Sequence, residues 1–275
     1  MKKLEGKVAL VSGAGRGIGQ AIALKLAAEG ARVVVNDLDE ASAADTARRI
    51  EASGGHALVC VGDVTRADFA PRFVAAALEG LGALDIIVNN AGYAWDSVVQ
   101  KMTDEQWYAM LDVHATAPLR ILRAAAEPIR QMAKKEKEEG RAVQRKIVNV
   151  TSIAGLYGNA GQVGYSAGKA AVIGLTKALA KEWGRYNVNV NAVAFGYIQT
   201  RMTQPIGAGE AVAQIGGREV KMGVQPELLA FMNKMIPLGR GGTPEEAAGA
   251  VYLLCIPESD YVSGEVLLAS GGFVM

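Results

Sequence analysis

The sequence predicts an α/β fold in which a single, doubly wound parallel sheet is flanked by helices on both faces. Short runs rich in Val, Ile and Ala alternate with alanine-rich stretches of helical periodicity, a rhythm typical of βαβ units with right-handed crossovers. The short runs show continuous Val, Ile and Ala character rather than strict alternation of apolar and polar residues, as expected for strands that are buried on both faces. No linker, low-complexity tract or internal repeat divides the chain, so residues 1–275 are expected to form one domain.

The expected elements follow one another regularly. Strands are predicted at 7–12, 32–37, 56–63, 84–90, 146–152 and 188–194, and helices at 19–30, 41–54, 67–80 and 107–132. Glycines are predicted to cap the carboxyl ends of the first three helices, at Gly30, Gly54 and Gly80.

The composition argues against several classes of function. The formal net charge is +1, so no electrostatic footprint for nucleic acid is visible. Cys60 and Cys255 are the only cysteines, too few and too far apart for a disulfide framework or a zinc site, and no metal is expected. No stretch has the length of a membrane span and the amino terminus lacks a signal peptide, so a cytoplasmic location is expected.

A glycine-rich turn follows the first strand and opens the first helix. Gly13, Gly17 and Gly19 have the spacing Gly-x-x-x-Gly-x-Gly, with Arg16 and Ile18 between them. Such glycines let the backbone turn tightly and approach a pyrophosphate, which rests on the helix N-terminus. Many strand-to-helix turns need glycine, but the position in the first βαβ unit favours dinucleotide binding.

The end of the second strand bears on the choice of cofactor. Asp37, followed by Leu38, lies about twenty residues past the glycines, where a carboxylate can bind the adenosine ribose of NAD and repel the 2′-phosphate of NADP. Arg16 acts in the opposite direction, because it could pair with that phosphate; alternatively it is a solvated side chain at a helix start. The sequence predicts NAD, with NADP as the alternative.

A tyrosine and a lysine stand four residues apart on a predicted helix. Tyr165 and Lys169 would therefore point the same way, although a Tyr-x-x-x-Lys spacing alone also arises by chance. Together with the glycine turn, the sequence Asn-Asn-Ala-Gly at 89–92 and Ser152 thirteen residues before Tyr165, this pair resembles the short-chain dehydrogenase/reductase family. The resemblance covers nearly the whole chain and implies a Rossmann-type sheet.

The resemblance also implies an active site. Lys169 would bind the nicotinamide ribose and favour the tyrosinate form of Tyr165, whose phenol has an ordinary pKa near ~10. Tyr165 would exchange a proton with the alcohol or carbonyl while hydride moves to or from the nicotinamide. Ser152 would hydrogen-bond the substrate oxygen, with Thr151 as a competitor for that role.

Further cofactor contacts carry over from the family position by position. The implied contacts are Asp63, Val64, Asn90, Ala91, Gly92, Gly196, Ile198 and Thr200. The alternative for each segment is an ordinary turn after a strand. The family usually has proline where this chain has Phe195, which leaves the shape of that loop open.

Two features depart from the family pattern. His114 stands where the family has an asparagine, the fourth member of its catalytic set, and is expected to relay protons because imidazole changes charge near pH ~6.5. The alternative is a histidine that only hydrogen-bonds a backbone carbonyl.

The second departure is a long segment at the substrate lid, residues 201–240, where Met202, Met222, Met232 and Met235 could make an apolar wall. Alternatively, residues 226–237 form an amphipathic helix that covers its own core.

Overall the chain resembles 3-oxoacyl-(acyl carrier protein) reductases and the related 3-hydroxyacyl-CoA dehydrogenases. The resemblance implies oxidoreduction between a secondary alcohol and a ketone of an acyl thioester, with an acyl carrier protein as a partner. The alternatives are a hydroxysteroid or other small-alcohol dehydrogenase, and a non-catalytic nucleotide-sensing regulator. Family likeness and the small apolar face of the Tyr165 helix predict a homotetramer.

Overall fold

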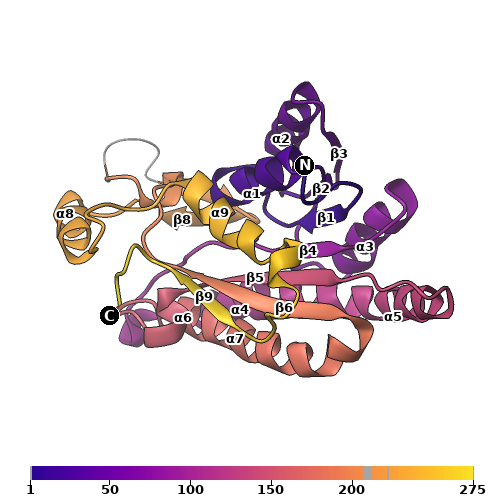
Figure 1. The fold of residues 1–275 in the computed structure, drawn as a ribbon. Coiled ribbons are helices and arrows are strands. Elements are labelled where there is room, and N and C mark those ends of the chain that lie inside the picture. Colours follow the sequence, from indigo (N-terminus) through magenta and orange to yellow (C-terminus); the bar gives the residue numbers. More distant parts are fainter. Residues whose placement is uncertain (1, 207–211, 222, 275) are drawn as a thin grey trace.

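The main sheet of the protein is parallel (Figure 1). The computed structural model describes residues 2–206, 212–221 and 223–274, and its seven-stranded sheet has the order β3-β2-β1-β4-β5-β6-β9. The strands are β1 (Val8–Val11), β2 (Arg32–Val35), β3 (His56–Val59), β4 (Ile86–Asn89), β5 (Arg145–Ser152), β6 (Val188–Phe195) and β9 (Val266–Ala269). Every neighbouring pair in this sheet is parallel. The predicted doubly wound sheet is confirmed, since the order reverses between β1 and β4.

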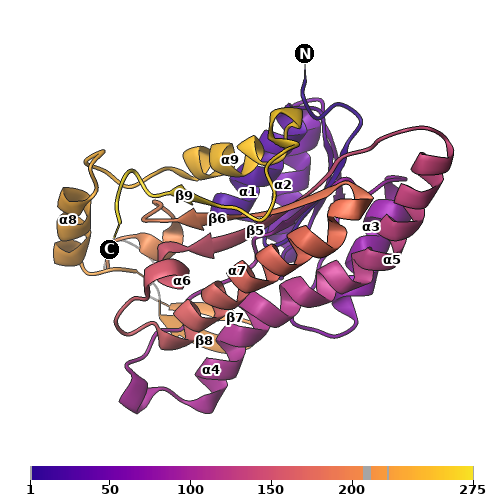
Figure 2. The same cartoon turned by 60° about the horizontal axis from the view of Figure 1, so that its bottom comes forward.

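Helices cover both faces of the sheet. One layer holds α1 (Gly17–Ala28), α2 (Glu40–Ala52) and α9 (Pro244–Leu253). The other holds α3 (Phe69–Gly80), α4 (Asp104–Leu111), α5 (Ala117–Glu138) and α7 (Val163–Trp183). Figure 2 shows α7 and α5 running side by side under the sheet, with α1 and α9 beyond it. Each layer buries its own apolar cluster against the sheet, which fixes where the strand ends and their loops lie.

The remaining helical elements are short. They are α6 (Ile153–Tyr157), α8 (Pro226–Met235), a π-helical turn at Asp112–Thr116, and 3₁₀ turns at Val99–Lys101, Gly184–Tyr186, Arg201–Thr203 and Pro257–Ser259. In the part of the chain that the structure describes, no helix combines the length and apolarity that a bilayer crossing requires.

Two sequence expectations are corrected. The helix predicted at 107–132 is two helices, α4 and α5, because the π-helical turn at Asp112–Thr116 interrupts it. The first of the two also begins earlier than predicted, at Asp104, because Thr103 and Gln106 form a capping box. Gly80 does not cap α3 but ends it, and the left-handed residue is Gly82, with a φ of +76°. Gly30 and Gly54 follow their helices with φ of +102° and +78°, as predicted.

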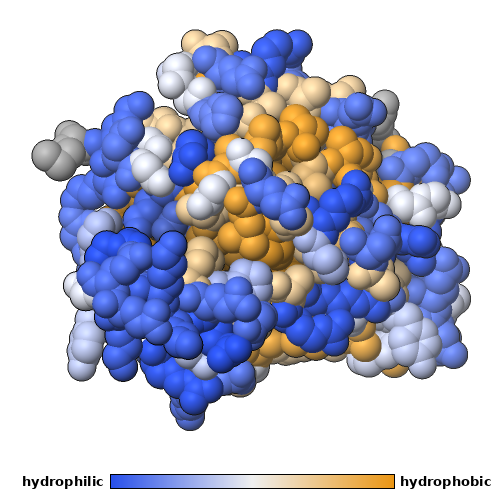
Figure 3. Space-filling view, turned by 90° about the vertical axis from the view of Figure 1, so that its right-hand side faces the viewer, coloured by the Kyte–Doolittle hydropathy of each residue, from blue (hydrophilic) through white to orange (hydrophobic). Residues whose placement is uncertain are grey.

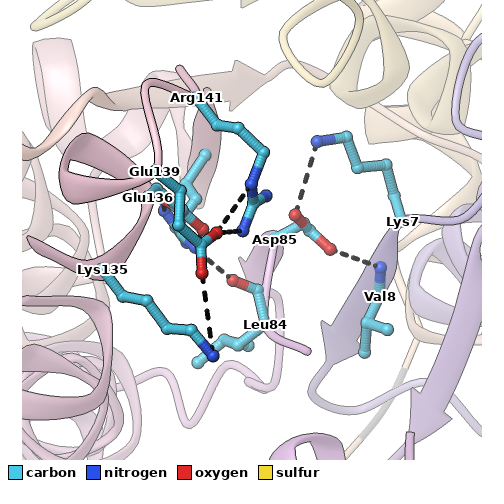
Figure 4. A network of polar contacts seen from close by, with 9 residues as sticks. Lys7, Val8, Leu84, Asp85, Lys135, Glu136, Glu139 and Arg141 are labelled. Atoms are coloured by element: carbon cyan, nitrogen blue, oxygen red, sulfur yellow. Dashed lines mark hydrogen bonds and ion pairs between the residues drawn. The ribbon is translucent and has the colours of Figure 1, made fainter. Parts of the chain in front are cut away.

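Charged residues at the amino ends of the strands are paired (Figure 4). Arg145 and Glu136 form a buried bidentate pair, with Nη1–Oε2 and Nη2–Oε1 distances of 2.9 and 2.5 Å. Arg145 Nε also donates to the Leu84 carbonyl at 3.1 Å. Asp85 accepts from the Val8 amide at 2.9 Å and from Lys7 Nζ at 3.4 Å, and Figure 4 shows its carboxylate between these two donors. This end of the sheet therefore leaves no charge of these residues uncompensated.

The segment after β6 is only partly the substrate wall that the sequence suggests. Met202 lines the cleft described below, whereas the α8 side chains do not; Leu229 is buried, but Leu228, Phe231 and Met235 are exposed. Met222 lies outside the described residues.

The segment after β6 also contains an antiparallel hairpin, β7 (Val212–Ile215) and β8 (Arg218–Lys221), which the sequence expectations missed. Its signal is Gly216-Gly217 between two short runs.

Not all apolar surface is buried within one copy of the chain. Figure 3 shows a face on which apolar side chains gather in a central patch inside a hydrophilic rim. The large exposed apolar residues include Leu238 and Leu253, which are 70% and 55% exposed.

Candidate active site

A cleft of about 480 Å³ lies at the carboxyl ends of the strands. Loops that follow β1, β2, β3, β4, β5 and β6 all contribute to its lining, as expected at the point where the strand order reverses. The structure brings together every residue that the sequence proposed for the site. These are Gly13, Arg16, Gly17, Ile18, Gly19, Asp37, Leu38, Asp63, Val64, Asn90, Ala91, Gly92, His114, Ser152, Tyr165, Lys169, Gly196, Ile198 and Thr200.

The glycine turn has the shape that its residues require. A Cβ at Gly13 would lie 2.7 Å from the Ala91 Cα, and one at Gly19 would lie 2.0 Å from the Gly13 carbonyl oxygen. Gly17, with a φ of +55°, has open space before it, with Thr200 Cγ2 at 3.8 Å as the nearest atom to its ideal Cβ. A side chain at Gly17 would fill the space in front of the helix N-terminus.

The first turn of α1 is free to bind an anion. Its N-cap residue, Arg16, makes no side-chain capping bond, and no acidic residue stands in the first turn. The amides there point to the cleft with the positive end of the helix dipole. Glycines that bring the backbone close, an uncapped helix and the open space at Gly17 together fit a dinucleotide pyrophosphate.

A buried polar network, which the sequence expectations missed, fixes this turn. Asn36 Oδ1 accepts from the Gly13 amide at 3.3 Å, and its Nδ2 donates to the carbonyls of Cys60 and Gly62, both at 3.0 Å. Ser12 Oγ accepts from the amides of Asn90 and Ala91 at 3.0 and 3.1 Å. The loops after β1, β2, β3 and β4 are thereby joined. A polar residue directly before Asp37 at the end of a buried strand was the available signal.

Asp37 and Arg16 do not pair with each other. Asp37 Oδ2 accepts from the Gly15 amide at 2.9 Å, which anchors the carboxylate beside the glycine turn. Arg16 instead forms an ion pair with Asp39, and its Nε donates to Ser42 Oγ at 2.7 Å. Both members of this ion pair are nearly half exposed, so the pair contributes little energy. A ligand phosphate at Arg16 would lie close to two carboxylates.

Tyr165, Lys169 and Ser152 meet at the β5 end of the cleft. Burial raises the pKa of the Tyr165 phenol to about 12, although a hydrogen bond with the Ser152 side chain opposes the rise. Burial lowers the pKa of Lys169 to about 7. Lys169 Nζ lies 5.8 Å from the Tyr165 ring centroid and donates to the Val150 carbonyl at 2.8 Å. The expected lowering of the phenol pKa by Lys169 is therefore absent here, because burial dominates and the ammonium is bound elsewhere.

The structure separates the two candidate hydroxyls. Thr151 Oγ1 is buried and donates to the Lys169 carbonyl at 2.7 Å, so it ties β5 to α7. Ser152 is half-buried, caps α6 by accepting from the Ala154 amide at 3.2 Å, and reaches the phenol. Only Ser152 of the two is placed to contact a ligand beside Tyr165.

His114 is buried against the tyrosine. Its ring meets that of Tyr165 edge-on, with centroids 5.0 Å apart and an interplanar angle of 87°. Nε2 lies 2.8 Å from the Tyr93 carbonyl oxygen, which can only accept, so Nε2 carries the proton; Nδ1 has no hydrogen-bond partner among the described residues. Burial and the nearby Lys169 hold the pKa of His114 well below its usual range. A lowered pKa favours a neutral imidazole at neutral pH, so the expected proton relay by a change of charge stays a prediction.

Comparisons with known proteins agree with this geometry. The family model described as short chain dehydrogenase matches residues 7–211. A 3-oxoacyl-[acyl-carrier-protein] reductase of Synechocystis sp. is 39% identical, with 100% of both chains covered. The short-chain reductase protein NovJ of Streptomyces niveus is 37% identical over 96% of this chain and 93% of its own. A crystal structure from Sinorhizobium meliloti 1021, named as a short-chain alcohol dehydrogenase, superposes with a TM-score of 0.84 at 32% identity, covering 98% and 97% of the two chains.

Proposed function

The chain belongs to the short-chain dehydrogenase family and is an oxidoreductase, and we propose that it reduces the ketone of a 3-oxoacyl thioester to a secondary alcohol with a nicotinamide dinucleotide. One observation carries the proposal: Ser152, Tyr165 and Lys169 lie in the same cleft as an uncapped glycine turn that fits a pyrophosphate. A protein that only sensed nucleotides would need the turn but not these three side chains.

The residues of the chain have distinct tasks in this reaction. The bound cofactor would supply the hydride to the carbonyl carbon. Tyr165 holds its proton at neutral pH, because its pKa is about 12, and donates it to the carbonyl oxygen as charge develops there. Ser152 donates a second hydrogen bond to the same oxygen. Lys169 would hold the ribose hydroxyls of the nicotinamide half of the cofactor, and a positive charge there would increase the acidity of the phenol.

The thioester substrate is proposed from the relatives. Several proteins that are 34–39% identical over 98% or more of this chain are named 3-oxoacyl-[acyl-carrier-protein] reductases. We propose an acyl carrier protein or coenzyme A as the carrier, in a cytoplasmic homotetramer whose single domain spans residues 1–275.

We propose NAD as the preferred cofactor. The Asp37 carboxylate is fixed beside the glycine turn by the Gly15 amide, so it can accept from ribose hydroxyls without moving. A 2′-phosphate on that ribose would be repelled by the carboxylate of Asp37. It would gain little from Arg16, because Asp39 already neutralises the Arg16 charge. Two like charges at ~4 Å cost about 4 kcal/mol at an effective dielectric of 20.

A substrate panel tests the proposal. Purified protein is assayed with acetoacetyl-coenzyme A, acetoacetyl-acyl carrier protein, a 3-oxosteroid and a simple cyclic ketone, each with NADH and NADPH. We expect the highest kcat/KM with a thioester and NADH. The similarity to a protein named as an alcohol dehydrogenase favours a small-alcohol dehydrogenase as the second candidate, and a higher kcat/KM for the cyclic ketone would establish it. No turnover of any ketone would overturn both.

A further inference from the structure

The β7–β8 hairpin contributes one wall of the cleft. Its strands are joined by Gly216 and Gly217, which have φ of +58° and +78°. Gln214, Ile215, Gly216 and Arg218 of this hairpin line the same cleft as the glycine turn. The hairpin follows β6, which ends at the catalytic side of the cleft, and forms a separate part of the cleft wall.

The turn of the hairpin lies at the β3 end of the cleft. An ideal Cβ at Gly216 would lie 3.8 Å from Asp63 Oδ2, and Asp63, Val64 and Thr65 line the cleft at the same place. In the sheet, β2, β1 and β4 separate β3 from β5, which ends at Ser152. At about 4.8 Å per strand, this end of the cleft is distant from the phenol and the lysine. The glycine turn that fits the pyrophosphate lies between the two ends.

The hairpin is anchored by both apolar and polar contacts. Val220 is only 2% exposed and belongs to the apolar cluster that contains Val64 and Tyr93, against which Ile215 also packs. Arg218 Nε donates to Glu105 Oε1 at 3.1 Å, at the start of α4. The Arg218 guanidinium also lies beside the Tyr93 phenol, where it offsets part of the rise in the pKa of Tyr93 that burial causes.

We propose that the β7–β8 hairpin is the outer wall of the subsite for the adenosine half of the dinucleotide, and that Arg218 and Val220 are the positioning residues that hold it over the Asp63–Thr65 turn. The inference rests on the proposed cofactor. Two glycines at the tip allow the backbone to come close to a flat ring without a side chain between them. A ring bound beside Val64 would be shielded from water by the hairpin, and its release would require the hairpin to move.

Fragments of the cofactor test the inference by direct binding. Dissociation constants are measured by tryptophan fluorescence for NADH and for reduced nicotinamide mononucleotide, which lacks adenosine. Arg218→Ala should weaken NADH binding about threefold to fivefold, as expected for an exposed ion pair. Val220→Ser should weaken it about tenfold, because it removes the apolar anchor. Neither should change the binding of the mononucleotide by more than about twofold.

Arg141→Ala is the matched control, because Arg141 is an exposed arginine paired with a glutamate at the other end of the molecule. It should leave both dissociation constants unchanged. Equal losses for NADH and the mononucleotide, or no loss with Val220→Ser in a protein whose melting temperature is unchanged, would overturn the inference.

Hydrogen exchange gives a second readout that needs no variant. ADP-ribose should slow exchange of the amides in 212–221, whereas the reduced mononucleotide should not. Protection by the mononucleotide alone, or none by saturating ADP-ribose, would overturn the hairpin assignment. These outcomes are independent of the proposed function, since a protein that shows them all but reduces no ketone would contradict only the proposed reaction.

Discussion

Buried ionisable groups are paired with opposite charges at one end of the sheet and lack such partners at the other. At the amino ends of the strands, Arg145 is matched by Glu136, and Lys146 by Asp260 at 2.7 Å. At the carboxyl ends, Lys169 is equally buried, but among the described residues its Nζ donates only to the Val150 carbonyl, and His114 Nδ1 has no partner there. The same sheet thus carries compensated charges at one end and uncompensated groups at the other.

The difference shows which end is under a functional constraint. A buried cation without a counter-ion costs stability and shifts its pKa, whereas a paired one mainly loses stability when its partner is removed. Groups that are held at such a cost are typical of sites that bind ligands or move protons. Substitutions at the carboxyl ends should therefore change activity, and substitutions at the amino ends should change stability.

The largest expected effect is that of Tyr165→Phe. Loss of the proton donor should lower kcat by about 10²–10⁴-fold, while the melting temperature should not fall, because Tyr165 is only partly buried and lines the cleft. Tyr261→Phe, at a fully exposed tyrosine, is the control and should leave kcat unchanged. A Tyr165→Phe variant that keeps a tenth of the wild-type kcat would break the comparison.

Arg145→Met should show the reverse pattern. It leaves the Glu136 carboxylate buried without its partner, which should lower the free energy of unfolding by about 3–5 kcal/mol, measured by urea denaturation. The kcat per folded molecule should match the wild type, because Arg145 is at the end of the sheet remote from the cleft. A selective loss of kcat with normal stability would contradict the division between the two ends.

The ionisation of Lys169 sharpens the comparison. Its pKa is lowered from 10.5 to about 7, so the free protein loses this charge as the pH rises through 7, and kcat/KM for the cofactor should fall about tenfold per pH unit above that point. In the unfolded chain the group stays protonated up to 10.5. The unfolded state therefore binds more protons between about 7 and 10.5, and the stability cost of the lysine decreases with rising pH in this window.

Lys169→Met separates these two effects. The variant should be more stable than the wild type at pH 7, and the difference in unfolding free energy should shrink as the pH approaches 10.5. A difference that stays constant over this range would show that Lys169 is not a buried cation in solution.

Asp37→Ala should alter cofactor choice without altering the chemistry. The ratio of kcat/KM for NADPH to that for NADH should rise about tenfold or more, because one carboxylate no longer repels the 2′-phosphate. Steady-state kinetics with both cofactors measure the ratio. A wild-type protein that already prefers NADPH would refute the assignment to NAD.

The smallest expected effect is that of His114. His114→Ala removes the hydrogen bond to the Tyr93 carbonyl and the edge contact with Tyr165, which should lower kcat about fivefold. His114→Asn should recover much of the loss, because an amide can also donate to that carbonyl. Since the ring stays neutral well below its usual pKa, the wild-type kcat should show no inflection near pH 6.5. An inflection near pH 6.5 that is abolished in His114→Asn would instead support a role of His114 as a proton relay.

Much of the fold and of the candidate site could be predicted from local patterns. Runs rich in Val, Ile and Ala predicted the first six strands to within a few residues, because strands of a parallel sheet favour continuous apolar character over strict alternation. The glycine spacing and the position of Asp37 predicted the dinucleotide end of the cleft, since parallel strands end at one edge of the sheet. The other lining residues were predicted from the resemblance to the family, position by position. The π-helical turn at Asp112–Thr116 was not visible, because its residues fit an uninterrupted helix equally well.

The sequence by itself determined the order of the elements, because periodicity is a property of neighbouring residues. Through the order and spacing of its motifs, which resemble those of the family, it also indicated which side chains share the cleft. Only the tertiary structure decided the ionisation of these groups and the partners of Arg16 and Arg218. The pKa values of Tyr165 and Lys169 depend on how completely distant elements exclude water around them, and pairs such as Arg218–Glu105 join residues that are 113 positions apart. Burial and long-range distance are set by packing, which no local pattern encodes.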